Sequence, residues 1–338
     1  FLNLSEMRDF VDLTDLFNAC KNISSLDLIL SELNSIMIDF SALPELHKLT
    51  NFFLQLHNFD NAPEFLFDSL KLCIDKHQTL QTFNLGFFAG FINADYECCL
   101  PLFDSMAEIL KDFTLQFSVV VGMYKGIKYL YEGVEKLSNI NYLGIAITEP
   151  QMRVSANFEP ILDFHLTQLE EVLQNKKHLD YLCFASPHIE LKKLSLNFSG
   201  AENLKKITLG IKANDQDISL IEEMANVLDL SYLEMGLLEH SEEGWYRVLK
   251  VLRKMKNLEV LRLREIRSLE EWKSDGLLKR LEEFLKNHTK LELLLCGKDS
   301  YIQVLMCTKT YYLKEADPDF WMHPSNIYET RPLKLIPL

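Results

Sequence analysis

The chain has 338 residues, of which 48% are hydrophobic and 11% aromatic, so its composition excludes an intrinsically disordered protein. Its formal net charge of −14 is uneven: residues 1–150 carry 9 Lys and Arg against 20 Asp and Glu, whereas residues 151–338 carry 26 against 29. This charge repels phosphate backbones, so direct binding of nucleic acid is not expected, and a basic partner fits the N-terminal half better. The alternative interpretation of the charge is a solvated acidic surface.

The cysteines and the apolar segments exclude two further classes of protein. Seven cysteines are widely spread and form no C-x-x-C pair, which fits neither a disulfide framework nor a zinc site. Reduced, mostly buried thiols in the cytoplasm are therefore expected. No apolar run approaches the roughly 20 residues that a membrane-spanning helix needs.

The first predicted element is a strand in "FLNL" at the start of residues 1–15, a segment that we expect to cap the N-terminal end. Residues 16–300 then repeat the pattern L-x-x-L-x-L, with Ile, Phe or Met allowed for Leu. A further copy at Leu191 lies close before one at Leu204, and the sequence does not decide between the two. Spaced by about 30 residues on average, the copies begin at Ile23, Leu49, Leu80, Leu110, Ile140, Leu179, Leu204, Leu230, Leu258 and Leu291.

Each copy predicts a strand, because alternate side chains of an extended segment share one face and the pattern places apolar residues on it. Between the copies, stretches with apolar residues at i, i+3, i+4 and i+7 predict amphipathic helices. Successive strands are expected to pair in a parallel sheet with the helices stacked outside it. Helices are about 10 Å wide and strands about 4.8 Å apart, so the array must curve with its strands inside. The predicted helices cover residues 63–76, 161–177, 218–228, 244–255 and 276–288.

Over about residues 15–300 the chain resembles leucine-rich repeat proteins of the ribonuclease-inhibitor-like type. The resemblance implies an α/β horseshoe solenoid of about ten irregular repeats, with parallel strands on the concave face and helices on the convex face. The family usually has Asn or Cys three residues after each copy, and this chain does not, so we expect irregular turns. Those positions hold Ser31, His57, Phe88, Ser118, Thr148, Pro187, Lys212, Leu238, Ile266 and Asp299.

Residues 301–338 are expected to form a C-terminal cap and an extended tail, because the end of a solenoid needs a cap. "YIQVLMCTKTYYL" predicts one or two further strands, and Phe320, Trp321 and Met322 would cover apolar surface. The alternative is a tail that binds a partner, since its prolines disfavour helix. Both interpretations stay open for residues 323–338.

The outward-facing strand positions are the candidates for partner binding. Tyr142, Tyr181 and Tyr232 would share one row of the inner face, with Lys206, Arg262 and Arg264 as charged neighbours. Tyrosine is common in binding hot spots, although it also simply suits strands. In the last repeat, Leu293 and Leu295 would be exposed on the same face. The full row is Ser25, Asn51, Thr82, Asp112, Tyr142, Tyr181, Lys206, Tyr232, Val260 and Leu293.

No motif for nucleotide binding, zinc hydrolysis or nucleophilic catalysis occurs, so we expect neither an enzyme nor a cofactor or metal site. The leading hypothesis is a non-catalytic scaffold or structural subunit of a larger assembly that binds a protein partner on its concave face, edge or C-terminal tail. One alternative is a substrate-recognition subunit of a ubiquitin ligase, from a faint F-box likeness at Ser41–Leu56. Another is a GTPase-activating protein of the leucine-rich repeat class.

Overall fold

The structure is a computed structural model of the whole chain. The structure describes the residues of the sheet, of most helices that cover it and of some of the turns between them. These are residues 2–3, 11–12, 14–31, 38–57, 64–88, 96–118, 124–148, 159–191, 196–213, 218–237, 242–266, 280, 283–285, 288, 291–297, 301–307 and 310–315.

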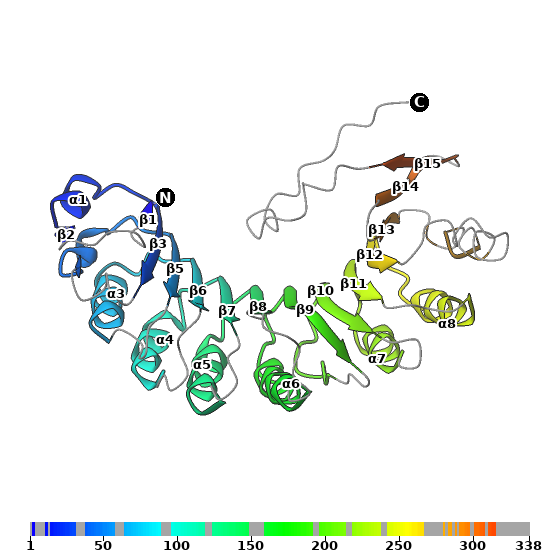
Figure 1. The fold of residues 1–338 in the computed structure, drawn as a ribbon, viewed down its shortest axis with the longest axis horizontal. Helices are drawn as coiled ribbons and strands as arrows, with labels where there is room; N and C mark the ends of the chain where they lie inside the picture. Colours follow the sequence, from blue (N-terminus) through cyan, green and yellow to red (C-terminus); the bar gives the residue numbers. More distant parts are fainter. Residues whose placement is uncertain are drawn as a thin grey trace.

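One sheet of thirteen strands runs through the described part of the chain, in an order that follows the sequence (Figure 1). Neighbouring strands pair in parallel from β1 to β13, and β13, β14 and β15 pair antiparallel. Two short strands, β2 (Val11–Asp12) and β4 (Ile38–Asp39), pair separately. The strands of the large sheet are β1 (Leu2–Asn3), β3 (Ser25–Ser31), β5 (Asn51–His57), β6 (Thr82–Phe88), β7 (Asp112–Ser118), β8 (Tyr142–Thr148), β9 (Tyr181–Leu191), β10 (Lys206–Ala213), β11 (Tyr232–Leu237), β12 (Val260–Ile266), β13 (Glu292–Gly297), β14 (Tyr301–Cys307) and β15 (Thr310–Glu315).

The repeat pattern predicted the strands β3 and β5–β13, and all ten are present, so the α/β class with a parallel sheet is confirmed. Leu191 is the last residue of β9, whereas β10 starts two residues after Leu204. The copy at Leu204 is therefore the one that supplies the next strand. The strand expected in "FLNL" is β1, which pairs with β3. The one or two strands expected after the last repeat are β14 and β15.

The helices lie on the outer side of the arc that the sheet follows, and the strands line its inner side (Figure 1). Four of the predicted helices are present as α3, α6, α7 and α8, whereas residues 276–288 are only partly described. Helices α1, α4 and α5 were not predicted. The elements are α1 (Thr14–Ala19), α3 (Glu64–His77), α4 (Leu100–Met106), α5 (Tyr124–Lys136), α6 (Glu159–Leu173), α7 (Ser219–Val227), α8 (Glu242–Leu252) and the 3-10 turns η1 (Leu43–Glu45) and η2 (Glu97–Cys99).

The core lies between the sheet and the helices and is built from the pattern residues. In β5, Phe52, Leu54 and Leu56 are buried, while the residues between them are partly exposed on the inner face. The first leucine of the copy, Leu49, is also buried where the chain enters the strand. Each such side chain contributes roughly 1.5–3 kcal/mol when it leaves water, which explains why the pattern recurs in every unit.

The strand pairing is irregular in the C-terminal half. The register shifts after Gly210 in the β9–β10 pair and after Leu263 in the β12–β13 pair. The register of the β12–β13 pair also corrects one prediction. Leu293 was expected in the exposed row, but it pairs with Leu261, which is a core position, and Glu292 pairs with Val260 of the row. The prediction was wrong because four leucines within five residues, 291–295, fit the repeat in more than one alignment.

Side-chain amides stabilise the turns that lead into the strands. They lie just before a copy of the repeat, whereas the asparagines usual in the leucine-rich repeat family follow it. Asn139 and Asn203 each directly precede the first apolar residue of a copy. The Asn139 amide donates to the carbonyl of Glu108 at 3.3 Å, and the Asn203 amide donates to that of Lys177 at 2.7 Å. The asparagines therefore satisfy backbone carbonyls before the strand rather than after it.

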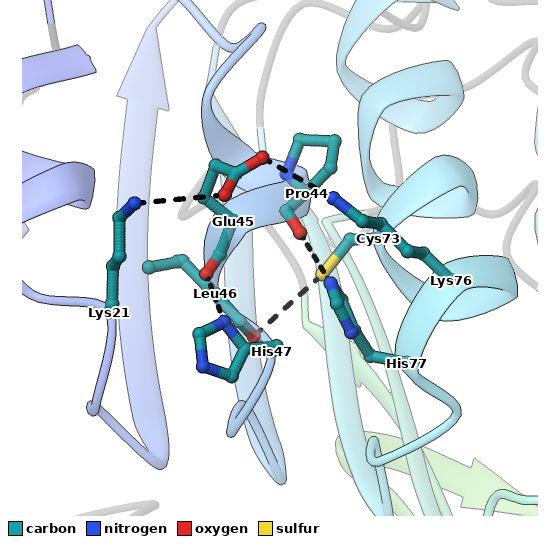
Figure 2. A network of polar contacts seen from close by, with 8 residues as sticks. All are labelled: Lys21, Pro44, Glu45, Leu46, His47, Cys73, Lys76 and His77. Atoms are coloured by element: carbon teal, nitrogen blue, oxygen red, sulfur yellow. Dashed lines mark hydrogen bonds and ion pairs between the residues drawn. The ribbon is translucent and has the colours of Figure 1, made fainter.

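Polar contacts also tie the outer turns of the first units together (Figure 2). The Glu45 carboxylate lies 3.8 Å from the Lys21 ammonium and 3.3 Å from that of Lys76. A ring nitrogen of His77, at the end of α3, lies 2.8 Å from the carbonyl oxygen of Pro44. Because both ion pairs are exposed, they contribute little stability, and their effect is to align neighbouring turns.

Candidate interaction surface on the inner face of the sheet

Four of the predicted binding residues lie on one line of the inner face. The strand register pairs Tyr142 with Tyr181, Tyr181 with Lys206 and Lys206 with Tyr232. Neighbouring strands are about 4.8 Å apart, so the four residues span about 14 Å. We call these four residues the tyrosine row.

The tyrosine rings pack against one another. The ring centres of Tyr142 and Tyr181 are 5.0 Å apart in an edge-to-face arrangement, and those of Tyr181 and Tyr232 are 5.9 Å apart across β10. Tyr142 is only 9% exposed, so it is less accessible than the sequence suggested. A Cβ atom on Gly144 would lie 2.9 Å from the Tyr142 hydroxyl, so this glycine leaves the space that the hydroxyl occupies.

The hydroxyl groups of the row are held by the next outward-facing position of the strands. The Tyr181 hydroxyl lies 2.9 Å from the Thr208 hydroxyl, and the Tyr232 hydroxyl donates to the Glu234 carboxylate. Burial raises the pKa of Tyr181 to about 12, and burial together with the Glu234 charge raises the pKa of Tyr232 as well. Both phenols are therefore neutral hydrogen-bonding groups at physiological pH.

Two basic side chains add charge to this surface: Lys206 within the row and Arg262 beside it. Lys206 remains exposed and pairs with Asp180 at 2.9 Å. The Arg262 guanidinium lies 5.5 Å from the centre of the Tyr232 ring and 4.0 Å from the carboxylate of Glu234, which is 3% exposed. The cation balances the buried carboxylate and covers the aromatic face, which fixes both side chains.

Arg264, the sixth predicted residue, follows Arg262 on β12 and pairs with Gly236 of β11. The described part of the structure covers its backbone and not its side chain. The structure thus brings Tyr142, Tyr181, Tyr232, Lys206 and Arg262 into one surface. Phe320, Trp321 and Met322 lie outside the described residues.

A second group of polar residues lies on the inner face of the N-terminal half; Thr82 and Asp112 were in the predicted row of candidates, whereas Asp27 and Asn84 were not predicted. The strand register pairs Asp27 with Phe53 and Phe53 with Asn84. Burial raises the pKa of Asp27, and it also raises that of Asp112, whose carboxyl is hydrogen-bonded to Thr82. A second outward-facing position in each copy would have added Asp27, Phe53 and Asn84 to the candidates.

The described residues contain no cluster typical of a metal centre and no helix able to span a membrane. No group of three or more His, Cys, Asp or Glu among them could hold a metal ion. None of the helices that the structure describes has the length and apolar character needed to cross a membrane. The five cysteines described in detail are thiols and do not form disulfides: Cys20, Cys73, Cys98, Cys99 and Cys183.

Comparisons with known proteins find similarity to solved structures and none to family models or curated sequences. No family model matches the chain, and no curated protein matches it in sequence. Among solved structures, the chain is similar to the crystal structure of the TLR13–ssRNA13 complex, with a TM-score of 0.32 and 12% sequence identity. The match covers 85% of this chain and 49% of the other, so this chain spans about half the length of that protein.

Proposed function

We propose that the protein is a non-catalytic, protein-binding scaffold: a leucine-rich repeat horseshoe of about ten irregular repeats that binds a protein partner on its inner face. The observation that carries the proposal is the tyrosine row, in which packed aromatic rings and the exposed side chain of Lys206 share one register line of the sheet. The register of a continuous parallel sheet holds this row, on the side of the arc that the helices leave open (Figure 1).

The physical argument rests on preorganisation. A side chain that is ordered only on binding loses roughly 0.5–1.5 kcal/mol of conformational entropy, and this cost lowers the affinity. The rings of Tyr181 and Tyr232 are already fixed by their hydroxyl contacts and by each other. They can therefore offer aromatic and hydroxyl contacts to a partner at low additional cost, as tyrosines in binding hot spots do.

The same proposal covers the two ends of the solenoid and the cellular compartment in which it acts. Residues 1–15 and 301–338 would cap the solenoid formed by residues 16–300, with the C-terminal tail as a further contact for the partner. The scaffold would act in the cytoplasm, as a structural subunit of a larger assembly. No observation favours the ubiquitin-ligase or GTPase-activating alternatives, and the segment Ser41–Leu56 contributes η1 and most of β5 to the repeating array.

The proposal is tested by reversing the charge at the centre of the row. Wild-type protein, Lys206→Glu and the control Lys177→Glu, which changes an exposed turn residue, would each be used to capture partners from native extract. We expect a partner that the wild type and Lys177→Glu retain and that Lys206→Glu loses. The Lys206–Asp180 ion pair is exposed, so its loss should leave the melting temperature nearly unchanged. Equal retention by all three proteins would contradict docking at the tyrosine row.

A further inference from the structure

Two buried oxygen atoms on the inner face of the N-terminal half, one from Asp27 and one from Asn84, accept no hydrogen bond. Asn84 is 8% exposed, yet its side-chain oxygen has no hydrogen-bond partner. One carboxylate oxygen of Asp27, two strands away on the same register line, is also buried without a partner. Buried acceptors are normally satisfied, and an exception requires an explanation. A ligand that supplies donors would explain both atoms.

The carboxylates of this region also lack a basic side chain among the described residues. Burial removes solvent from Asp27 and Asp112; the positive charge of the chain's amino group offsets part of this effect for Asp27, and no charged group does so for Asp112 among the described residues. The only side-chain contact that offsets the burial of Asp112 is the Thr82 hydroxyl. A desolvated carboxylate attracts a cation more strongly than a solvated one does, because water screens the charge less.

The aromatic ring between these groups suits the same kind of ligand. Phe53 lies between Asp27 and Asn84 on the register line and is partly exposed on the inner face. The face of an aromatic ring attracts guanidinium and ammonium groups within about 6 Å of its centre. An acidic group beside a phenylalanine therefore favours the cationic side chains of Arg or Lys over neutral donors.

The net charge of the N-terminal half also favours a ligand that carries Arg or Lys side chains. Residues 1–150, which include these strands, carry a net charge of −11, with 9 basic residues against 20 acidic ones. Such an excess attracts basic polypeptides and orients them before contact. Lys206 and Arg262, in contrast, lie on the C-terminal half of the same sheet.

We propose that the inner face of β3, β5, β6 and β7 binds a basic segment of a protein partner. Its Arg or Lys side chains donate to Asp27, Asn84 and Asp112 and lie against Phe53. The site rests on the proposed function only in taking the partner to be a protein, and it uses none of the residues of the tyrosine row. The site is a second contact with the partner, and it is specific for positively charged side chains.

The experiment measures binding of a fluorescent oligo-arginine peptide to the full chain by fluorescence anisotropy, with an oligo-glutamate peptide of the same length as the negative probe. Asp112→Asn keeps the size of the side chain, and Asp68→Asn removes the same charge from the exposed side of α3. We expect the dissociation constant of oligo-arginine to rise about tenfold for Asp112→Asn and to change less than about twofold for Asp68→Asn. Phe53→Leu, which keeps an apolar side chain, should also weaken binding.

Three outcomes would overturn the site. They are no binding of oligo-arginine by the wild type, equal weakening by Asp112→Asn and Asp68→Asn, or no weakening by both Asp112→Asn and Phe53→Leu. Equal weakening would show attraction by net charge alone. Circular dichroism melting of each variant ensures that only folded proteins are compared. Lys206→Glu separates the two proposals, because it should abolish partner capture and leave oligo-arginine binding intact.

Discussion

At the scale of single residues, a buried lysine closes the C-terminal end of helix α5. The Lys176 side chain is fully buried, and its ammonium donates to the carbonyl oxygens of Val134 at 2.8 Å, Glu135 at 2.9 Å and Leu137 at 2.6 Å. The last carbonyls of a helix have no partner within it, and they attract a positive charge. Burial lowers the pKa of Lys176 to about 8, so the group is still mostly protonated at neutral pH.

Replacing this lysine should cost considerable stability. Lys176→Met keeps the length of the side chain and removes the donor from three carbonyls, two of them buried, so we expect the free energy of unfolding to fall by about 3 kcal/mol. The control is Lys177→Met, which alters the exposed neighbouring side chain and should change stability by less than about 0.5 kcal/mol. Urea unfolding followed by circular dichroism measures both. Similar midpoints for the two variants would show that the lysine does not cap the helix.

A second buried residue makes stability depend on pH. His165 on α6 is fully buried, and its Nδ1 atom lies 2.9 Å from the Tyr131 hydroxyl on α5. Burial lowers the pKa of His165 from 6.5 to about 3, so the folded protein keeps it neutral. Between these two values the unfolded chain binds a proton that the folded chain does not. Stability from this group is therefore complete above pH 6.5 and is lost as the pH falls towards 3.

The test compares the free energies of unfolding of the wild type and His165→Gln, from urea denaturation, as the pH is lowered. Glutamine can still hydrogen-bond to Tyr131 but does not titrate, so the variant should lose stability less steeply. The difference in slope should approach about 1.4 kcal/mol per pH unit in the middle of the window. Parallel pH profiles for the two proteins would refute the assignment.

At the scale of elements, the repeat predicted the strands well because burial dictates one apolar residue at every second position. Helix α5 was not predicted, although Ile127, Leu130 and Val134 have helical spacing, because Gly126 and Gly133 weaken its helix propensity. The predicted register of β13 was wrong because several neighbouring leucines fit the repeat in more than one alignment. The contacts of Lys176 join residues about 40 positions apart, and local sequence patterns carry no information on such contacts.

The candidate surface was predictable to the same extent. The repeat alone placed Tyr142, Tyr181 and Tyr232 on one row, and the strand register agrees. The packing of the rings and the hydrogen bonds of their hydroxyls depend on side-chain rotamers, which the spacing of residues in the sequence does not determine. The unpaired oxygens of Asp27 and Asn84 likewise become visible only when neighbouring side chains bury them.

One of the glycines in α5 sets how closely two helices pack. A Cβ atom at Gly133 would lie 2.3 Å from the buried Phe103 ring of α4. Gly133→Ala should therefore destabilise the protein by about 1 kcal/mol or more, since the cost of overpacking exceeds the gain in helix propensity. Lys128→Ala, on the exposed side of the same helix, should change stability by less than about 0.5 kcal/mol. Thermal melting decides, and stabilisation by Gly133→Ala would show that the helices are not in such close contact.

At the scale of the whole molecule, one curved sheet presents two chemically different halves on its inner face (Figure 1). The N-terminal half carries buried acceptors around Phe53, and the C-terminal half carries the tyrosine row, which includes Lys206, beside Arg262. A partner that crosses both halves would place a basic segment on the first and a complementary surface on the second. The division would also fix its orientation, because the reversed placement brings like charges together.

The most direct test of docking on the inner face is site-specific photocrosslinking. The photoreactive amino acid p-benzoylphenylalanine would replace Lys206 on the inner face or Lys128 on the outer side of α5, and each protein would be irradiated in native extract. We predict a discrete crosslinked partner from position 206, which excess unlabelled wild-type protein displaces and Lys206→Glu does not, and no such product from position 128. A displaceable product from position 128, with none from position 206, would contradict the account.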